Sequence, residues 1–366
     1  MKVQYFNFSD SSLNYKFKSS KILLTAAFKN HFILGKEVDK FEEKWSKFIG
    51  VKHSVGVSNG YDGLVLALKA LNLPKKFTVA VPAHTFIASW YAIHSAGGIP
   101  VGIDVDEDGL IDLNFLENIY PLPNVVMPVH MHGRMVNMPR LCDWARKNSI
   151  LIIEDASQSH GAKINQKHAG TWGELGVFSL YPSKNLGAFG DAAVVATNSS
   201  DYYNTLKSLR NYGSKIDNKY VHELIGQNSR LDTIQAAILN YNLDQLNNWN
   251  IKRKIIANQY LNNINGSEKI KLPNAASSEM VWHHFVLQVE NRNEVQNKLT
   301  NLGIQTEIHY PKVAGIEYLK IFGKVGNFPR SLERSEKSLS LPINQWLTKR
   351  KVKFVISEIN KITAQK

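Results

Sequence analysis

The sequence is poor in cysteine, in long apolar runs and in acidic residues. Cys142 is the only cysteine among 366 residues, so no disulfide can form within the chain, and a reducing compartment such as the cytoplasm is expected. No apolar run approaches the roughly 18 residues that a membrane-spanning helix needs. The opening segment, MKVQYFNFSD, lacks the apolar core of a signal peptide. We therefore expect a cytoplasmic protein that does not enter a membrane.

The shortage of acidic residues gives the chain a positive charge. Lysine and arginine number 44 against 31 aspartates and glutamates, a formal net charge of +13. The basic residues are scattered, however, and the densest cluster, TKRKVKF at 348–354, lies in a candidate terminal helix. This pattern does not predict nucleic-acid binding. A positive field that steers small anionic ligands to the protein explains the charge more simply.

Strand-like and helical patterns alternate along most of the chain. Apolar runs typical of strands lie at 53–58, 77–82, 124–133, 150–153, 177–181 and 192–198. Helical periodicity or helical composition follows at 37–48, 58–71, 84–98, 138–148, 202–212 and 231–246. Such alternation predicts an α/β fold with a large, mostly parallel sheet covered by helices on both faces.

The pattern changes towards the C-terminus. Strands are predicted at 279–289 and 303–311, with a helix at 293–303 between them. This order is typical of a small α+β domain, and the length of the chain is sufficient for two domains. We predict a large domain over residues 1–250 and a small C-terminal domain over residues 251–366. The first 30 residues are expected to form no more than a loose helix.

Two residues at predicted strand ends carry the clearest chemical signal. Asp155 closes the apolar run at 150–153, where open α/β sheets place their ligands. It could cap the next turn or hold a cationic group. Lys184 lies in a turn after the run at 177–181, with no second charge within five residues. An amine that forms a Schiff base must be partly desolvated, and an aspartate with such a lysine is the pair that pyridoxal phosphate requires.

Two further patterns leave alternatives open. Ser58 or Asn59 can cap the helix at 58–71, and the turn before this helix could be either an ordinary cap or a cradle for an anion. His130 and His132 share one face of the strand predicted at 124–133 by its two-residue period. Two histidines could bind a metal, but no third ligand is evident, so we expect no metal site.

Four segments together identify a family. The sequence resembles the DegT/DnrJ/StrS family of pyridoxal-phosphate-dependent nucleotide-sugar aminotransferases, which have the fold-type I architecture. The resemblance runs from about Phe32 to the C-terminus. The matching segments, in the order that the family has them, are FILGKEVDKFEEKW, EDASQSHGA, FSLYPSKNLGAFGD and GQNSRLDTIQAAIL.

The resemblance implies a set of cofactor contacts. Lys184 would form the imine, and Asp155 would keep the pyridine nitrogen protonated. An aromatic residue at a helix start is usually core, but in the family it stacks on the pyridine ring. Threonine often stands where this chain has tyrosine at 61, so only the backbone amide can be carried over there. The implied cofactor-binding residues are Gly60, Tyr61, Phe86, Asp155, Gln158, Ser179 and Lys184, with Asn228 reaching the cofactor phosphate of the partner subunit.

The resemblance also implies the substrates. His309 and Tyr310 match the substrate-side HYP motif, although the KVAGIEYL that follows departs from the family pattern. The pair Ser89 and Trp90 occurs in members that aminate the 3-position of a keto-deoxyhexose. We therefore expect a homodimer with composite sites that transfers an amino group from glutamate to a dTDP-linked 3-keto-6-deoxyhexose.

The sequence leaves the exact reaction and the roles of three histidines open. Amination at the 4-position of a nucleotide-linked 4-keto sugar is one alternative, and a sensor that binds pyridoxal phosphate or a sugar nucleotide without turnover is another. Either His130 or His132 is expected to line the sugar pocket. His160 could orient Asp155 or satisfy a buried amide.

Overall fold

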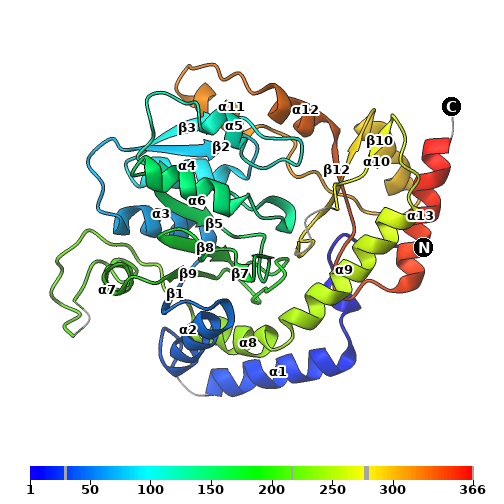
Figure 1. Ribbon diagram of the computed structural model, residues 1–366. Coiled ribbons are helices and arrows are strands. Elements are labelled where there is room, and N and C mark those ends of the chain that lie inside the picture. The colour runs from blue at the N-terminus through cyan, green and yellow to red at the C-terminus, as the bar shows by residue number, and fades with distance from the viewer. Residues whose placement is uncertain (29–30, 216, 276–279, 365–366) are drawn as a thin grey trace.

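The protein has a large sheet region and a smaller C-terminal region, and a long helix runs between them (Figure 1). The computed structural model describes residues 1–28, 31–215, 217–275 and 280–364. No helix within these ranges combines the length and the apolar character that crossing a membrane requires.

The large region is built on a seven-stranded sheet with the order β1-β9-β8-β5-β4-β2-β3. β9 is antiparallel to both of its neighbours, β1 and β8. All other neighbouring strands in the sheet are parallel. The predicted mostly parallel α/β sheet is therefore confirmed. The strands are β1 (His53–Val57), β2 (Thr78–Pro82), β3 (Ile99–Ile103), β4 (Val125–Val126), β5 (Leu151–Asp155), β8 (Leu175–Ser179) and β9 (Ala193–Thr197).

Both faces of this sheet are covered, which explains why its strands have continuous apolar runs. Neighbouring residues of one strand enter different cores. Ile152 and Phe178 belong to the core under α2, α6 and α8, whereas Ile153 and Val177 belong to the core under α3, α4 and α7. These helices are α2 (Lys36–Ile49), α3 (Gly60–Ala70), α4 (Ile87–Ser95), α6 (Met138–Lys147), α7 (Ser200–Leu209) and α8 (Thr233–Leu243).

The smaller region has its own core. Its antiparallel sheet has the order β10-β11-β12 and packs with α9, α10 and α13. Val3, near the N-terminus, joins this core and forms a bridge with Ile304. The elements are α9 (Leu246–Asn263), β10 (Ile270–Lys271), β11 (Phe285–Val289), α10 (Arg292–Asn301), β12 (Ser338–Leu341) and α13 (Lys349–Ala364).

The remaining elements are short or connect the two regions. α1 (Leu13–Phe28) lies along α8 at the bottom of the sheet region in Figure 1. After the C-terminal region has begun, the chain returns to the large one, and Ala314 of α11 packs in the core under α4. The others are η1 (Phe8–Asp10), α5 (Leu113–Leu116), η2 (Met131–Gly133), β6 (Lys163–Ile164), β7 (Lys167–His168), α11 (Ala314–Ile321) and α12 (Pro329–Lys337).

Three predicted strands are shorter than expected. The run at 124–133 is a strand only at Val125–Val126, because Pro128 cannot donate to a ladder and the chain then turns into η2. The run at 303–311 forms only isolated bridges, one of them between Glu307 and Ser340. The run at 279–289 is a strand from Phe285 onwards, and Glu279 lies outside the described residues.

Two helical predictions are also adjusted. The helix expected at 231–246 ends at Leu243, and α9 begins three residues later and continues to Asn263. The opening segment forms a well-defined helix, α1, rather than a loose one. Division of the chain at residue 250 remains a prediction, and this point lies inside α9.

Candidate active site

Asp155 lies at the carboxyl end of β5, the central strand of the large sheet, and is 6% exposed. Its Oδ2 accepts a hydrogen bond of 2.9 Å from the Ser89 hydroxyl, and its Oδ1 accepts one of 3.2 Å from the backbone N–H of Ser157. The second bond caps the next turn, as the sequence allowed. Together the two bonds fix the plane of the carboxylate and leave lone pairs on both oxygens.

Lys184 lies in the turn after β8 and is half-buried. Its backbone N–H donates to the carbonyl of Tyr181 at 2.9 Å, which closes the turn. Burial lowers the pKa of Lys184 from 10.5 to about 8, and the carboxylate of Asp155 opposes this shift. The two residues therefore interact electrostatically, and the amine of Lys184 has an accessible neutral form close to physiological pH.

The N-terminus of α3 forms a cradle with the end of β8. Asn59 caps the helix, since its side chain accepts from the backbone N–H of Asp62 at 2.8 Å. A Cβ added to Gly60 would lie 2.9 Å from Cβ of Ser179 and 3.3 Å from its Oγ. Only glycine therefore lets the helix start come this close to the Ser179 hydroxyl. The Tyr61 hydroxyl lies 2.6 Å from the Ser95 hydroxyl at the end of α4, so this side chain is already engaged with the neighbouring helix.

Three predicted site residues meet beside Asp155. The Gln158 amide donates to the Tyr310 hydroxyl at 3.1 Å, and the rings of Tyr310 and Phe86 lie 5.6 Å apart between centroids. Phe86, at the start of α4, is 56% exposed. The usual interpretation of an aromatic residue at a helix start, a place in the core, is therefore wrong for Phe86, and its ring is open to a ligand.

His309 lies beside this group on the same C-terminal segment. Its Nδ1 is 2.9 Å from the Ser340 hydroxyl, and its ring stacks on His284 with centroids 3.7 Å apart. Burial, with a smaller contribution from Lys184, lowers the pKa of His309 to about 3. His309 is consequently neutral at physiological pH.

The structure decides three histidine assignments. His130 and His132 do not share a strand face, because His132 lies in η2 with a φ of 62°. His130 is fully buried with its Nε2 2.9 Å from Glu154, so it is a structural partner of that carboxylate. His160 does not orient Asp155, because its Nε2 lies 2.8 Å from the carbonyl of Ser179. This contact matches the alternative in which His160 satisfies a buried peptide group, here through the carbonyl oxygen of Ser179.

His132 lies next to the candidate site without entering it. Its backbone N–H donates to the Gln158 side chain at 2.7 Å, and the imidazole lines a cleft between the two regions, which also contains Arg134 and Arg334. Within the described parts of the chain, no group of histidine, cysteine, aspartate and glutamate residues is arranged to hold a metal ion.

Asn228 is not brought into the site of its own chain by any side-chain hydrogen bond among the described residues. Its side chain is exposed, and its backbone forms an isolated bridge with Asn211. The next residue, Ser229, is buried with its hydroxyl 2.8 Å from that of Ser58, which precedes the cap of α3. The segment thus passes close to the cradle while Asn228 faces outwards.

Sequence reasoning missed two contacts of the site. Ser157, which binds Asp155, also accepts through its hydroxyl from the backbone N–H of Ser179 at 3.3 Å, and its place two residues after Asp155 could have indicated this. His84 is fully buried, with Nε2 near both the carbonyl and the N–H of Tyr310. His84 and Tyr310 are 226 positions apart, so the sequence carries no local signal of this contact.

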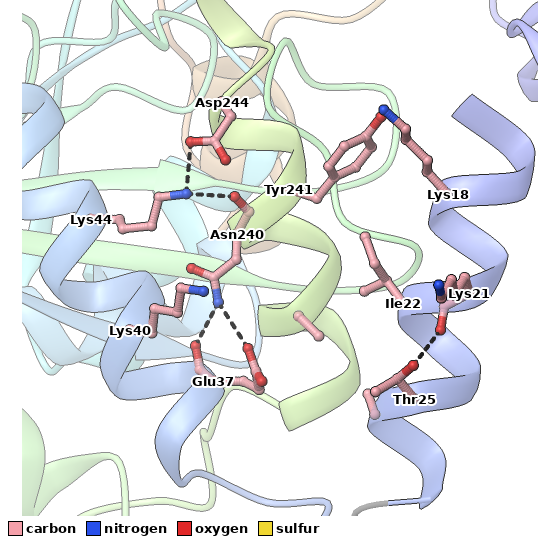
Figure 2. Close-up of a pocket in the computed structure, with 12 residues that line it drawn as sticks. Lys18, Lys21, Ile22, Thr25, Glu37, Lys40, Lys44, Asn240, Tyr241 and Asp244 are labelled. Atoms are coloured by element: carbon pink, nitrogen blue, oxygen red, sulfur yellow. Dashed lines mark hydrogen bonds and ion pairs between the residues drawn. The ribbon is translucent and has the colours of Figure 1, made fainter. Parts of the chain in front are cut away.

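A separate cleft of about 450 Å³ lies between α1, α2 and α8, away from this site. Lys44 donates to the carbonyl of Asn240 at 2.8 Å and to the carboxylate of Asp244 at 2.7 Å (Figure 2). The Asn240 amide donates to the carbonyl of Glu37 on α2. These contacts join α2 to α8, and none of the predicted site residues lines the cleft.

The residues at the carboxyl ends of β5 and β8 fit pyridoxal phosphate. The helix start at Gly60 and the hydroxyl of Ser179 provide donors for a phosphate. Asp155 provides a fixed anion for a pyridinium nitrogen, and Lys184 provides an amine that can lose its proton. Three segments of the chain contribute these groups: the start of α3, the end of β5, and β8 with the turn that follows it.

Comparison with known proteins agrees with this fit. The chain is 37% identical to dTDP-3-amino-3,4,6-trideoxy-alpha-D-glucose transaminase of Streptomyces venezuelae over 333 residues, which are 90% of this chain and 87% of the relative. It is 36% identical to UDP-N-acetyl-3-dehydro-alpha-D-glucosamine 3-aminotransferase of Acidithiobacillus ferrooxidans, over 85% of both chains. The crystal structure of DesV from S. venezuelae, in complex with a ketimine intermediate, matches with a TM-score of 0.95 and 34% identity over 100% of this chain and 99% of that one.

The fold is that of a fold-type I aminotransferase, a class of pyridoxal-phosphate-dependent enzymes. Residues 18–360 match the DegT/DnrJ/EryC1/StrS aminotransferase family, to which this chain therefore belongs. The resemblance seen in the sequence is confirmed, and so are the enzyme class and the cofactor that it implied.

Proposed function

We propose that this enzyme transfers an amino group from glutamate to the keto carbon of a nucleotide-linked deoxyhexose, with a dTDP-3-keto-6-deoxyhexose as the best candidate. The observation that carries the proposal is the convergence of Asp155, Lys184 and the cradle of Gly60 and Ser179 at one edge of the sheet. The names of the relatives support a nucleotide sugar aminated at carbon 3, and they differ in the nucleotide.

Lys184 is the proposed proton carrier. With a pKa of about 8, about a tenth of the free amine is neutral at pH 7, which is sufficient for it to act as a base. In the first half-reaction, the Lys184 amine would take the proton from the donor carbon and hold it beside the bound cofactor. In the second half-reaction, the same amine moves a proton in the opposite direction on the sugar.

Asp155 and its neighbours are proposed to hold the ring in place. When bound, pyridoxal phosphate supplies an electron sink for the pair left behind by the lost proton and carries the amino group between substrates. The Asp155 carboxylate, held by Ser89 and Ser157, would pair with the ring nitrogen. Gln158 would contact the ring edge, and the exposed ring of Phe86 would stack on the cofactor.

The substrate side is proposed to use His309 and Tyr310. Because His309 is neutral, it can donate or accept a hydrogen bond at a sugar hydroxyl without introducing a charge. Ser89 and Trp90 contribute indirectly, since the Ser89 hydroxyl is bound to Asp155 and the buried Trp90 donates to the carbonyl of Pro82 at 3.0 Å. Any influence of this pair on the aminated carbon would therefore act through Asp155 and the packing of α4.

Spectroscopy followed by a substrate panel tests the proposal. The purified protein should be yellow and should bleach when glutamate is added, with 2-oxoglutarate as a product. The bleached protein should then regain its colour with a dTDP-linked 3-keto sugar, and product NMR should place the new amine on carbon 3. An amine on carbon 4 would support the alternative substrate, and a yellow protein that ignores glutamate would support the sensor.

We also propose a homodimer with composite sites, in which Asn228 contacts the cofactor phosphate of the partner subunit. Exposed Asn228 supports this, and so does an apolar stripe on α1 formed by Leu13, Phe17, Leu24 and Phe28, which are 61–83% exposed. These four residues repeat at helical spacing on one side of α1, and a second copy of the chain would cover them. The cytoplasmic location stays a prediction from the sequence.

A further inference from the structure

A chain of buried and part-buried hydrogen bonds runs behind the candidate site. The ring Nδ1 of His283 lies 3.1 Å from Oδ1 of Asn185, the residue after the site lysine. The Asn185 amide donates to Oδ1 of Asn250 on α9 at 2.8 Å, and the Asn250 amide donates to the carbonyl of His160 at 2.9 Å. The His160 ring, in turn, lies 2.8 Å from the carbonyl of Ser179.

The direction of every bond in this chain is determined. A carbonyl oxygen can only accept, so the proton of His160 must be on Nε2. Burial lowers the pKa of His160 to about 3 and that of His283 well below its ordinary value, so each ring carries a single proton at pH 7. Asn185 donates a second bond to the carbonyl of Val281 at 2.9 Å, which leaves its oxygen to accept from His283.

The backbone leaves space for this chain. Gly161, which follows His160, has a φ of +94°, and a Cβ there would lie 2.9 Å from the amide nitrogen of Asn250. A side chain at this position would push the Asn250 amide away from the His160 carbonyl. On the other side of the turn, the buried amide of Asn242 donates to the carbonyl of Gly187 at 2.8 Å. The turn that carries Lys184 is thus held by two helices.

We propose that the chain from Asn185 through Asn250 and His160 sets the spacing between Lys184 and Ser179. Asn250 is then a positioning residue for both ends of the cofactor, although it touches neither end. The inference rests on the proposed roles of Lys184 as the residue that binds the aldehyde carbon and of Ser179 as a phosphate ligand. A ligand that uses both anchors gains from a fixed spacing, whereas a ligand that uses one anchor does not.

Three ligands separate these cases. Pyridoxal phosphate can use both anchors, because its aldehyde condenses with the Lys184 amine, with loss of water, and its phosphate meets Ser179. Pyridoxal lacks the phosphate, and pyridoxamine phosphate lacks the aldehyde. Dissociation constants for all three would be measured on wild type, on Asn250→Ala and on Asn248→Ala, a control at an exposed asparagine of the same helix.

The expected result is selective. Asn250→Ala should weaken the affinity for pyridoxal phosphate by about tenfold, which is the effect of leaving buried partners unpaired. The affinity for the other two ligands should change by less than about twofold. Asn248→Ala should leave the affinity for all three ligands unchanged. Equal losses for all three ligands, or no loss for any, would overturn the proposal. If Asn250→Ala does not fold, Asn250→Asp keeps the shape of the side chain, loses the donor to His160 and should give the same pattern.

These outcomes distinguish the spacing inference from the proposed function. A wild-type protein that binds pyridoxal phosphate but shows equal losses in Asn250→Ala contradicts only the inference about spacing. A wild-type protein that does not bind pyridoxal phosphate contradicts both.

Discussion

The substitution Gly60→Ala tests the cradle with a single added methyl group. Its Cβ would lie 2.9 Å from Cβ, 3.3 Å from Oγ and 3.4 Å from Cα of Ser179. The first distance is too short for two carbon atoms, so Ser179 must move by several tenths of an ångström. The Ser179 backbone is held by Ser157 and His160, which limits how the strand end can yield.

Two contributions to folding stability oppose one another in this variant. Overpacking costs about 1–3 kcal/mol, and replacing glycine by alanine in a helix gains up to about 1 kcal/mol. The net loss of folding stability should therefore be about 0–3 kcal/mol. Loss of a hydrogen bond to a charged phosphate costs about 1.5–3 kcal/mol, so affinity for pyridoxamine phosphate should fall roughly 10- to 150-fold.

The assay compares ligands with and without a phosphate. Gly60→Ala should weaken the binding of pyridoxal phosphate and pyridoxamine phosphate and leave the binding of pyridoxal unchanged, as measured by fluorescence titration. Gly266→Ala is the matched control, because the nearest atom to its added Cβ would lie 3.8 Å away. The reasoning is refuted if Gly60→Ala binds pyridoxamine phosphate as tightly as wild type does, or if pyridoxal is weakened to the same extent.

Three further predictions concern the charged groups and the dimer. Asp155→Asn should still bind cofactor but should transaminate at least about 100-fold more slowly, because a neutral amide cannot stabilise a protonated ring nitrogen; single-turnover rates equal to wild type would remove Asp155 from this role. Mixing inactive Lys184→Ala protein with Asn228→Asp protein should restore about half of wild-type activity per mixed dimer, since one of its two sites then carries neither lesion. No recovery would mean that Asn228 serves the site of its own subunit. In the cofactor-free protein, the folded pKa of Lys184 lies below its unfolded value, about 8 against 10.5. The unfolded chain therefore binds more protons between these values, and urea unfolding should show wild type gaining stability relative to Lys184→Met as pH rises through this window; a difference that stays constant with pH would contradict the burial of the amine.

Much of the large region follows from local sequence patterns. The strand that ends at Asp155 is buried on both faces, so its apolar run is continuous and its end is marked by the first carboxylates. The cap of α3 was readable as Ser58 or Asn59, because a short polar side chain before an apolar helix satisfies free backbone donors, and the structure shows that it is Asn59. Asp155 and Lys184 were indicated by their positions at strand ends, whereas the other site residues came from the resemblance to a family, and the structure shows which of them lie together.

Other features depend on partners that are distant in the chain. The run at 303–311 has the alternation of a strand but forms only isolated bridges, because its neighbours are single residues near the N-terminus and in β12. His132 occupies a left-handed turn instead of a strand, where its carbonyl accepts from the N–H groups of His283 and His284.

The sequence by itself determined the alternating architecture, the strand-end position of Asp155 and the turn that carries Lys184, since each depends on neighbours within a few residues. Only the tertiary structure decided what holds these groups. The bonds from Ser89 to Asp155 and from Asn250 to His160 join residues 66 and 90 positions apart. Such pairs leave no periodic trace, because a hydrogen bond requires proximity in space and imposes no spacing along the chain.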